Sequence, residues 1–239
     1  MSMIWDRLET SPAVRSFVRR SGLKTLIESL HPPAAVYERK FGAALLAAVR
    51  SGDVVWDVGA NIGHYTQQLA RAVGETGQVI CFEPVTSTHA RLVAGLKRVG
   101  CRNAVPYQVA LGSHESDVPI RTTTAADGVT NSLVSVGAPP MGTHVEVVHV
   151  VRGDLLVATG VPSPQVLKVD VEAFEEDVLF GLRDTLRSAS CRAVFCEVHF
   201  GQLERRGFRR APLRIESLLR DLGFAVRWVD SSHLQALRR

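Results

Sequence analysis

Three carboxylates in this sequence stand directly after predicted strands: Asp57, Glu83 and Asp170. In open α/β sheets, ligands bind beyond the carboxyl ends of the strands. A charged group that is buried there without a partner is energetically costly, so each carboxylate needs a ligand or a cation. We therefore expect these three positions, and Ala110 after a further strand, to face a ligand.

A glycine-containing loop follows the first of these carboxylates. Asp57 ends an apolar strand, and the loop residues Gly59, Asn61 and Gly63 precede a predicted helix. Gly59 permits a sharp turn, and Gly63 permits close approach of a helix or a ligand to the backbone. The spacing differs from the G-x-G-x-x-G of dinucleotide sites, and a carboxylate here would repel a pyrophosphate. The loop resembles the first motif of class I S-adenosylmethionine methyltransferases, whose cofactor is positively charged.

Residues beside this loop each have two interpretations. Glu83, which Pro84 follows, lies where an acidic residue accepts hydrogen bonds from ribose hydroxyls, or it caps the next helix. His64 either covers the cofactor or lies on the helix surface. We group Tyr65 with the residues expected to line the cofactor.

Lys168, Asp170 and Glu172 form a second constellation, and in strand geometry they share one face. A lysine between two acids is one way to build a purely structural ion network. Alternatively, the three residues are catalytic and lie where a methyl acceptor would bind. Methyl transfer to a neutral hydroxyl releases a proton, so Asp170 or Glu172 is a candidate base. Their oxygens also suit a hard cation such as Mg²⁺, although the sequence does not establish a metal requirement.

His199 follows Glu197 at the end of the next strand and lies on the same face by alternation. Its imidazole is a suitable proton acceptor near neutral pH. A single histidine is more often structural, so a catalytic or substrate-contacting role and a structural role both stay open.

Alternating strands and helices must position these residues. A strand is predicted from Val54 to Asp57, and further strands over Gln78–Phe82, Asn103–Val109, Gln165–Asp170, Arg192–Glu197 and Phe224–Val229. Helices are predicted over Thr86–Val99 and Phe174–Leu186, and from Pro212 to Gly223. This alternation indicates a doubly wound, mostly parallel sheet with helices on both faces.

Two segments depart from the alternation. Residues 1–50 are predicted to be a helical extension, and residues 51–239 the main domain. The basic, amphipathic first helix either packs on the domain or rests on a membrane surface. Residues of about 113–151 form an insertion near the cleft mouth, in which a strand returns at Thr143–Val151. Within it, Asn131 and Ser132 form an ordinary turn unless they contact the cofactor or substrate.

Composition narrows the class of protein. The chain has 239 residues, of which 46% are hydrophobic and 22% charged, as in ordinary globular proteins. A net charge of +4 is explained by a solvated surface, so we expect no nucleic-acid partner. The four cysteines form no C-x-x-C pair, which favours free thiols in the cytoplasm. No signal peptide or transmembrane segment is predicted, and a homo-oligomer is compatible with the sequence.

With these pieces in place, the chain resembles the FkbM family of S-adenosylmethionine-dependent methyltransferases from about Val54 to Glu197. The features that carry the resemblance are Asp57-Val-Gly-Ala-Asn-Ile-Gly63, Phe82-Glu83-Pro84, Val109-Ala-Leu-Gly112, Asn131-Ser132, and Leu167-Lys-Val-Asp-Val-Glu172 with Glu175 and Gly181. The resemblance implies a Rossmann-like sheet of about seven strands with the last one antiparallel. It also implies that residues 57–63 line the cofactor, that Glu83 holds its ribose, and that Asp170 and Glu172 face the reacting centre.

Two departures from the family pattern concern the turn after the fourth core strand and Asp154, which precedes that strand. Ala173 stands where the family usually has glycine, so this turn is expected to be altered. Arg152-Gly153-Asp154 replaces the usual leucine–aspartate segment, which leaves the role of Asp154 open.

The sequence therefore predicts O-methylation of a hydroxyl on a small molecule, a sugar, a glycolipid or another natural product. The alternatives are a non-catalytic interaction protein that keeps the fold, and a dinucleotide-dependent oxidoreductase. The missing third glycine and Asp57 count against the oxidoreductase.

Overall fold

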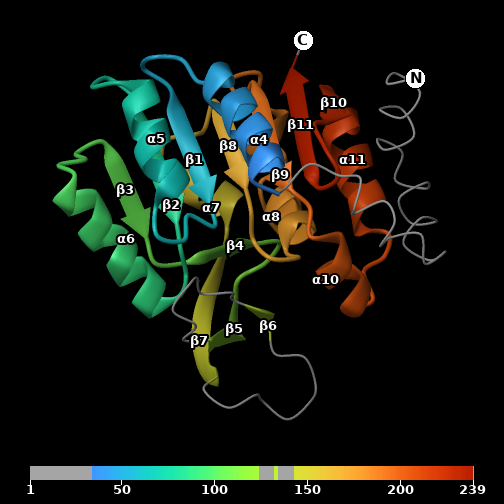
Figure 1. Ribbon diagram of the computed structural model, residues 1–239. Helices are drawn as coiled ribbons and strands as arrows, with labels where there is room; N and C mark the ends of the chain where they lie inside the picture. The colour runs from blue at the N-terminus through green and yellow to red at the C-terminus, as the bar shows by residue number, and fades with distance from the viewer. Residues whose placement is uncertain (1–33, 124–131, 134–142, 239) are drawn as a thin grey trace.

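A computed structural model describes residues 34–123, 132–133 and 143–238 of the chain. Its centre is a seven-stranded sheet in the order β10-β11-β9-β8-β1-β2-β3 (Figure 1). The strands are β1 (Val54–Val58), β2 (Gln78–Phe82), β3 (Ala104–Tyr107), β8 (Val166–Val169), β9 (Ala193–Glu197), β10 (Phe224–Trp228) and β11 (His233–Arg238). β11 is antiparallel to both of its neighbours, whereas β1, β2, β3, β8 and β9 pair in parallel. The predicted Rossmann-like architecture is confirmed, including the antiparallel last strand.

Helices cover both faces of this sheet (Figure 1). On one face lie α4 (Ala34–Ala48), α5 (His64–Val73) and α6 (Thr86–Arg98), and on the other lie α8 (Glu175–Gly181), α9 (Arg183–Arg187) and α11 (Ala211–Asp221). The single helix predicted over Phe174–Leu186 is wrong, because the chain breaks at Leu182 into α8 and α9. Gly181 allows the end of α8 to lie close to the backbone at Gly112: a Cβ on Gly181 would lie 1.9 Å from the Gly112 carbonyl oxygen.

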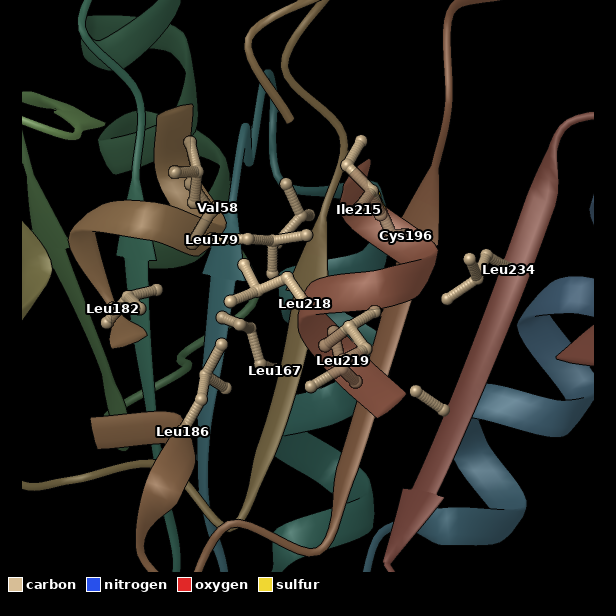
Figure 2. Packing of buried hydrophobic residues seen from close by; sticks show 14 of the residues in the cluster. Val58, Leu167, Leu179, Leu182, Leu186, Cys196, Ile215, Leu218, Leu219 and Leu234 are labelled. Atoms are coloured by element: carbon tan, nitrogen blue, oxygen red, sulfur yellow. The ribbon is translucent and has the colours of Figure 1, made fainter. Parts of the chain in front are cut away.

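Alternation along the strands sends side chains into two apolar layers. Figure 2 shows the layer under α8, α9 and α11, where Leu179, Leu182 and Ile215 meet Val58 and Leu167 of the sheet. On the opposite face, Phe41 and Leu45 of α4 and Leu69 of α5 pack on the alternate strand positions. These positions include Val55 of β1 and Phe195 of β9. Each fully buried side chain of this kind contributes roughly 1.5–3 kcal/mol. The two layers therefore hold the strand ends in fixed positions.

A second, four-stranded sheet in the order β4-β7-β5-β6 flanks one end of the first. It comprises β4 (Ala110–Gly112), β5 (Ser116–Thr123), β6 (Ser132–Leu133) and β7 (Thr143–Arg152). β7 confirms the strand predicted at 143–151. β5 was not predicted, because Pro119 and the polar residues at both ends of the segment hide a strand. This strand pairs with β7 from Ser116↔Val150 to Thr123↔Thr143.

Besides β4, β5 and β6, the sequence analysis did not place α7 (Gly153–Ala158), α10 (Phe200–Arg205) or the segment that forms β11. The start of α7 gives Asp154 a structural role. Its carboxylate accepts hydrogen bonds from the Thr185 backbone N–H (2.8 Å) and hydroxyl (2.7 Å), and from the Asp184 N–H (3.1 Å). Asp154 therefore ties α7 to the start of α9.

α4 confirms the second helix predicted for the N-terminal extension, and Phe41 and Leu45 on it are buried. The preceding basic helix and its membrane contact lie outside the described residues. Among the helices that are described, none combines the length and the apolar character needed to cross a bilayer.

Candidate active site

The loop after β1 touches the loop after β8, and Gly59 is the point of contact. Gly59 has a φ of +78°, and a Cβ on it would lie 1.8 Å from the Asp170 carbonyl oxygen. Gly63 also has a left-handed φ of +90°, and its Cβ would lie 2.6 Å from Leu92 Cδ1 of α6. The two glycines therefore bring the strand ends and the α6 helix close together.

Glu83 supports the same loop from β2. One carboxylate oxygen accepts the Asn61 backbone N–H (3.1 Å), and the other accepts the Val85 N–H (3.0 Å) at the N-terminus of α6. The residue is 3% exposed, and burial raises the pKa of its carboxyl to about 7, although the two N–H donors oppose this. Glu83 thus ties the loop after β1 to the residue before α6 and lines the cavity described below, and its ribose role stays a prediction.

Lys168 and Asp57 form a buried ion pair behind the loop. Lys168 Nζ lies 3.0 Å from Asp57 Oδ1, 3.5 Å from Asp170 Oδ2 and 3.0 Å from the Gly59 carbonyl oxygen, to which it donates a hydrogen bond. Thr66 Oγ1 donates to Asp57 Oδ2 at 2.6 Å. Burial alone would lower the pKa of the Lys168 ammonium, but Asp57 and Asp170 raise it above its usual value. Lys168 is 2% exposed, which favours the structural ion network over a catalytic role.

A cavity of about 350 Å³ opens beyond the carboxyl ends of β1, β2 and β8. Gly59, Asn61, Glu83 and Pro84 after β1 and β2 line it. It is also lined by Asp170, Val171, Glu172, Phe174 and Asp177 after β8, and by Arg206 after α10. One space therefore joins the expected cofactor residues to the expected acceptor residues.

Strands of the second sheet line one part of this cavity. Ser116, Val118 and Ile120 of β5 line it, whereas the intervening Asp117 and Pro119 are exposed. Ala110 lines it as predicted, at the start of β4. Because side chains alternate along a strand, one face of β5 lies against the cavity and the other faces solvent.

Arg206 was not singled out by the sequence analysis, because nothing distinguishes it within an arginine-rich stretch. Its guanidinium stacks over the Phe174 ring, with its central carbon 3.9 Å from the ring centroid, and donates to the Ala173 carbonyl oxygen. It brings a positive charge to a largely apolar cavity whose acidic lining residues are Glu83, Asp170, Glu172 and Asp177.

His199 is surrounded by carboxylates. Its Nδ1 lies 2.6 Å from Glu175 Oε1, and its Nε2 lies 3.7 Å from Asp170, 3.6 Å from Glu172 and 3.9 Å from Glu197, measured to carboxylate oxygens. Burial alone would lower the pKa of the imidazole, but the bond to Glu175 and the nearby charges raise it to about 9. An imidazole that is already protonated is a poor proton acceptor, which favours Asp170 or Glu172 as the base.

Glu172 reaches this group by a turn and not by strand alternation. β8 ends at Val169, and both Glu172 (φ +51°) and Ala173 (φ +75°) adopt left-handed conformations. Such conformations cost an L-residue roughly 1–2 kcal/mol. The turn therefore keeps a backbone shape that suits glycine, although Ala173 occupies it.

We expect Ala173→Gly to stabilise the protein by about 0.5–1 kcal/mol, because glycine adopts this φ without strain and loses only part of the gain to unfolded-state entropy. Urea denaturation measures the change. The matched control is Ala94→Gly at an exposed position of α6, which should destabilise by about 0.5–1 kcal/mol. Equal destabilisation by both substitutions would contradict the strain at Ala173.

The remaining sequence candidates lie away from the cavity or outside the description. His64 is exposed and contacts Gln68, and the Tyr65 ring packs edge-on against Phe41. Asn131 lies outside the described residues, and Ser132 is described only as part of β6, opposite Arg121. Glu175, although noted in the resemblance, was not proposed for the site; its position in the first turn of α8 was the available signal.

Comparison with known proteins gives one family and several structural relatives. The sequence model of the family described as "Methyltransferase FkbM domain" matches residues 57–226. Hexuronic acid methyltransferase AglP from Haloferax volcanii is 33% identical over 158 residues, which cover 66% of this chain and 60% of AglP. The chain thus spans less than two thirds of this curated relative.

Two solved structures share the fold at low sequence identity. Cofactor-bound Rv0187 from MTB superimposes with a TM-score of 0.51 at 13% identity, covering 87% of this chain and 82% of its own. SMU.1697c from Streptococcus mutans, solved in complex with SAH, gives 0.50 at 10% identity, covering 83% of this chain and 95% of its own.

Proposed function

Because the chain belongs to the FkbM methyltransferase domain family, we propose that it transfers a methyl group from S-adenosylmethionine to a hydroxyl of a small molecule or sugar. The observation that carries the proposal is the single cavity that joins Gly59, Asn61 and Glu83 to Asp170 and Glu172. At Gly59 the loop lies so close to the Asp170 carbonyl oxygen that no Cβ fits. Asp170 and Glu172 bring their carboxylates to the same cavity.

Residues of this chain would perform two tasks, ribose binding and proton removal. Glu83 would accept hydrogen bonds from ribose hydroxyls, since each of its oxygens has a second lone pair beyond its backbone donor. When bound, S-adenosylmethionine supplies a sulfonium methyl group, and the carbon–sulfur bond that breaks leaves its electron pair on sulfur. Asp170 or Glu172 would accept the acceptor hydroxyl proton as the oxygen–carbon bond forms, and positioning would provide most of the rate acceleration.

An acidic sugar is the acceptor class that we propose. AglP is named a hexuronic acid methyltransferase, and Arg206 places a guanidinium on the acceptor side of the cavity. Arginine pairs with carboxylates through two parallel hydrogen bonds. A uronic acid with its carboxylate on Arg206 would be kept from the surrounding acids and oriented for transfer.

Calorimetric titration tests the cofactor first. Micromolar binding of S-adenosylmethionine and S-adenosylhomocysteine, with no binding of NAD or NADP, is the expected result. Binding of a nicotinamide dinucleotide alone would support the oxidoreductase. Transfer of a radiolabelled methyl group to glucuronic or galacturonic acid glycosides then separates an enzyme from a non-catalytic relative, and uncharged glycosides serve as the comparison.

We expect cofactor affinity to fall as the pH drops through about 7, because the free protein then protonates Glu83 and the ribose loses an acceptor. The protein with ionised Glu83 binds the ribose most tightly. The dissociation constant of S-adenosylhomocysteine should therefore be about tenfold higher at pH 6 than at pH 8. Glu83→Gln should weaken binding and flatten this dependence. An unchanged pH profile in the variant would remove Glu83 from the ribose role.

Asp170→Asn should lower kcat by about 100-fold or more while cofactor affinity changes less than threefold, because it removes a candidate proton acceptor without altering the side-chain shape. Single-turnover methyl transfer and calorimetry measure the two quantities. Asp184→Asn removes a carboxylate from an exposed pair with Arg187 and is the control. Full activity of the Asp170 variant would exclude it as the base.

A further inference from the structure

Three potential ligands converge where β8 and β9 end. Asp170 follows β8, Glu197 ends β9 and His199 lies two residues further, and each offers a ligand atom within 4.8 Å of the others. We propose that Asp170, Glu197 and His199 bind a divalent transition-metal ion such as Mn²⁺.

The distances within this group fit a shared ion better than direct hydrogen bonds. His199 Nε2 lies 3.7 Å from Asp170 Oδ1 and 3.9 Å from Glu197 Oε1. Hydrogen bonds to nitrogen span roughly 2.7–3.2 Å. Two atoms that each lie about 2.1 Å from one metal ion are separated by roughly 3.0–3.4 Å at octahedral or tetrahedral angles. The Nε2 atom is thus too far from these two carboxylates for a hydrogen bond, and a shift of a few tenths of an ångström would give the spacing of shared ligands.

Glu175 fixes the orientation that this site requires. Its Oε1 lies 2.6 Å from His199 Nδ1, and it also accepts the Ala173 backbone N–H at 2.8 Å. The side chain is fully buried, so it cannot turn away to solvent. A carboxylate that holds one nitrogen of a histidine and aims the other at a metal is a recurrent feature of metal sites.

Charge also favours a cation here. Four carboxylates surround His199: those of Asp170, Glu172, Glu175 and Glu197. Among the described residues, Lys168 also contacts Asp170, and His233 also contacts Glu197. Asp170 and Glu197 are about one third exposed, which leaves a route for an ion from the cavity side.

The donor set indicates the kind of ion. Mg²⁺ prefers oxygen ligands and retains its waters, whereas an imidazole nitrogen with carboxylate oxygens suits Mn²⁺, Fe²⁺ or Zn²⁺. Asp170 also lines the cavity, so the ion would lie beside the acceptor. Its role there rests on the proposed function: it would hold the acceptor hydroxyl and ease loss of the proton to Glu172, because a metal-bound Asp170 would not itself be the base. The metal site itself does not depend on that function.

The test is Mn²⁺ binding by the tag-free full chain after removal of metals with a chelator. We expect one bound Mn²⁺ by electron paramagnetic resonance titration, and one histidine nitrogen coupled to it in the spin-echo modulation. Asp170→Asn, Glu197→Gln and His199→Gln should each weaken binding at least tenfold, and the nitrogen coupling should vanish in the histidine variant. The control is His149→Gln, which alters an exposed histidine–carboxylate pair with Asp117 and should change affinity less than twofold.

The outcomes separate the site from the function. Absence of stoichiometric Mn²⁺ binding by the folded wild-type protein would overturn the site, and so would affinity and nitrogen coupling that survive in the folded variants. If S-adenosylhomocysteine still binds in either case, the proposed function stands. Binding of Mn²⁺ with the expected nitrogen coupling, without binding of the cofactor, would support the metal site and overturn the proposed function. The wild-type spectrum alone keeps the test decisive if a variant does not fold.

Discussion

Gly59→Ala is expected to destabilise the protein by more than about 4 kcal/mol or to prevent its folding. A Cβ at this position would lie 1.8 Å from the Asp170 carbonyl oxygen, which is a backbone atom and cannot rotate away. The left-handed φ of +78° adds a cost of roughly 1–2 kcal/mol for any L-residue with a side chain. Equilibrium unfolding in urea, followed by circular dichroism, measures the loss.

Gly100→Ala is the matched control, because it shares the left-handed φ but not the contact. Gly100 has a φ of +66° and no atom within 4 Å of an added Cβ. This variant should lose only about 1 kcal/mol. If the two variants lost equal stability, the loops after β1 and β8 would not be held together as closely as Gly59 indicates.

Lys168→Met is expected to destabilise the protein by about 3–5 kcal/mol, because it removes one partner of a buried ion pair and leaves Asp57 uncompensated. Asp57 is fully buried and would keep only the hydrogen bond from Thr66. The Gly59 carbonyl oxygen would also lose its donor. Methionine preserves most of the volume, so the effect reports charge more than packing.

A double-mutant cycle with Asp57→Asn distinguishes charge from packing. The asparagine removes the stranded charge, so the double variant should be more stable than Lys168→Met alone. Lys97→Met on the exposed end of α6 is the control and should lie within about 0.5 kcal/mol of the wild type. No recovery in the double variant would mean that Lys168 acts through packing and not through its charge.

These two variants concern the framework of the site, whereas Asp170 and Glu83 concern its chemistry. Lys168 was first considered as a catalytic residue, and its burial explains why the structural role is favoured. A charged group that is 2% exposed has no route to a substrate, but it can fix Asp57, the Gly59 carbonyl and Asp170 relative to one another. Loss of Lys168 should therefore affect cofactor binding only through the loop that it holds.

The sequence by itself indicated a mostly parallel sheet, the shared edge at which its strands end and the glycine loop. These features are local: a buried strand is an apolar run, a tight turn requires glycine, and parallel strands must end at the same edge. For that reason Asp57, Gly59, Glu83 and Asp170 could be assigned to one edge before any coordinates were known.

Only the tertiary structure decided which of these residues face the cavity and which support it. Periodicity states which face a side chain takes within one element, but not how segments far apart in the chain meet. The ring of carboxylates around His199, the cavity position of Arg206 and the part of the cavity lining formed by β5 and β7 all arise from such meetings. Protonation also depends on burial and neighbouring charge, so the raised pKa of His199 emerges only when the chain is folded.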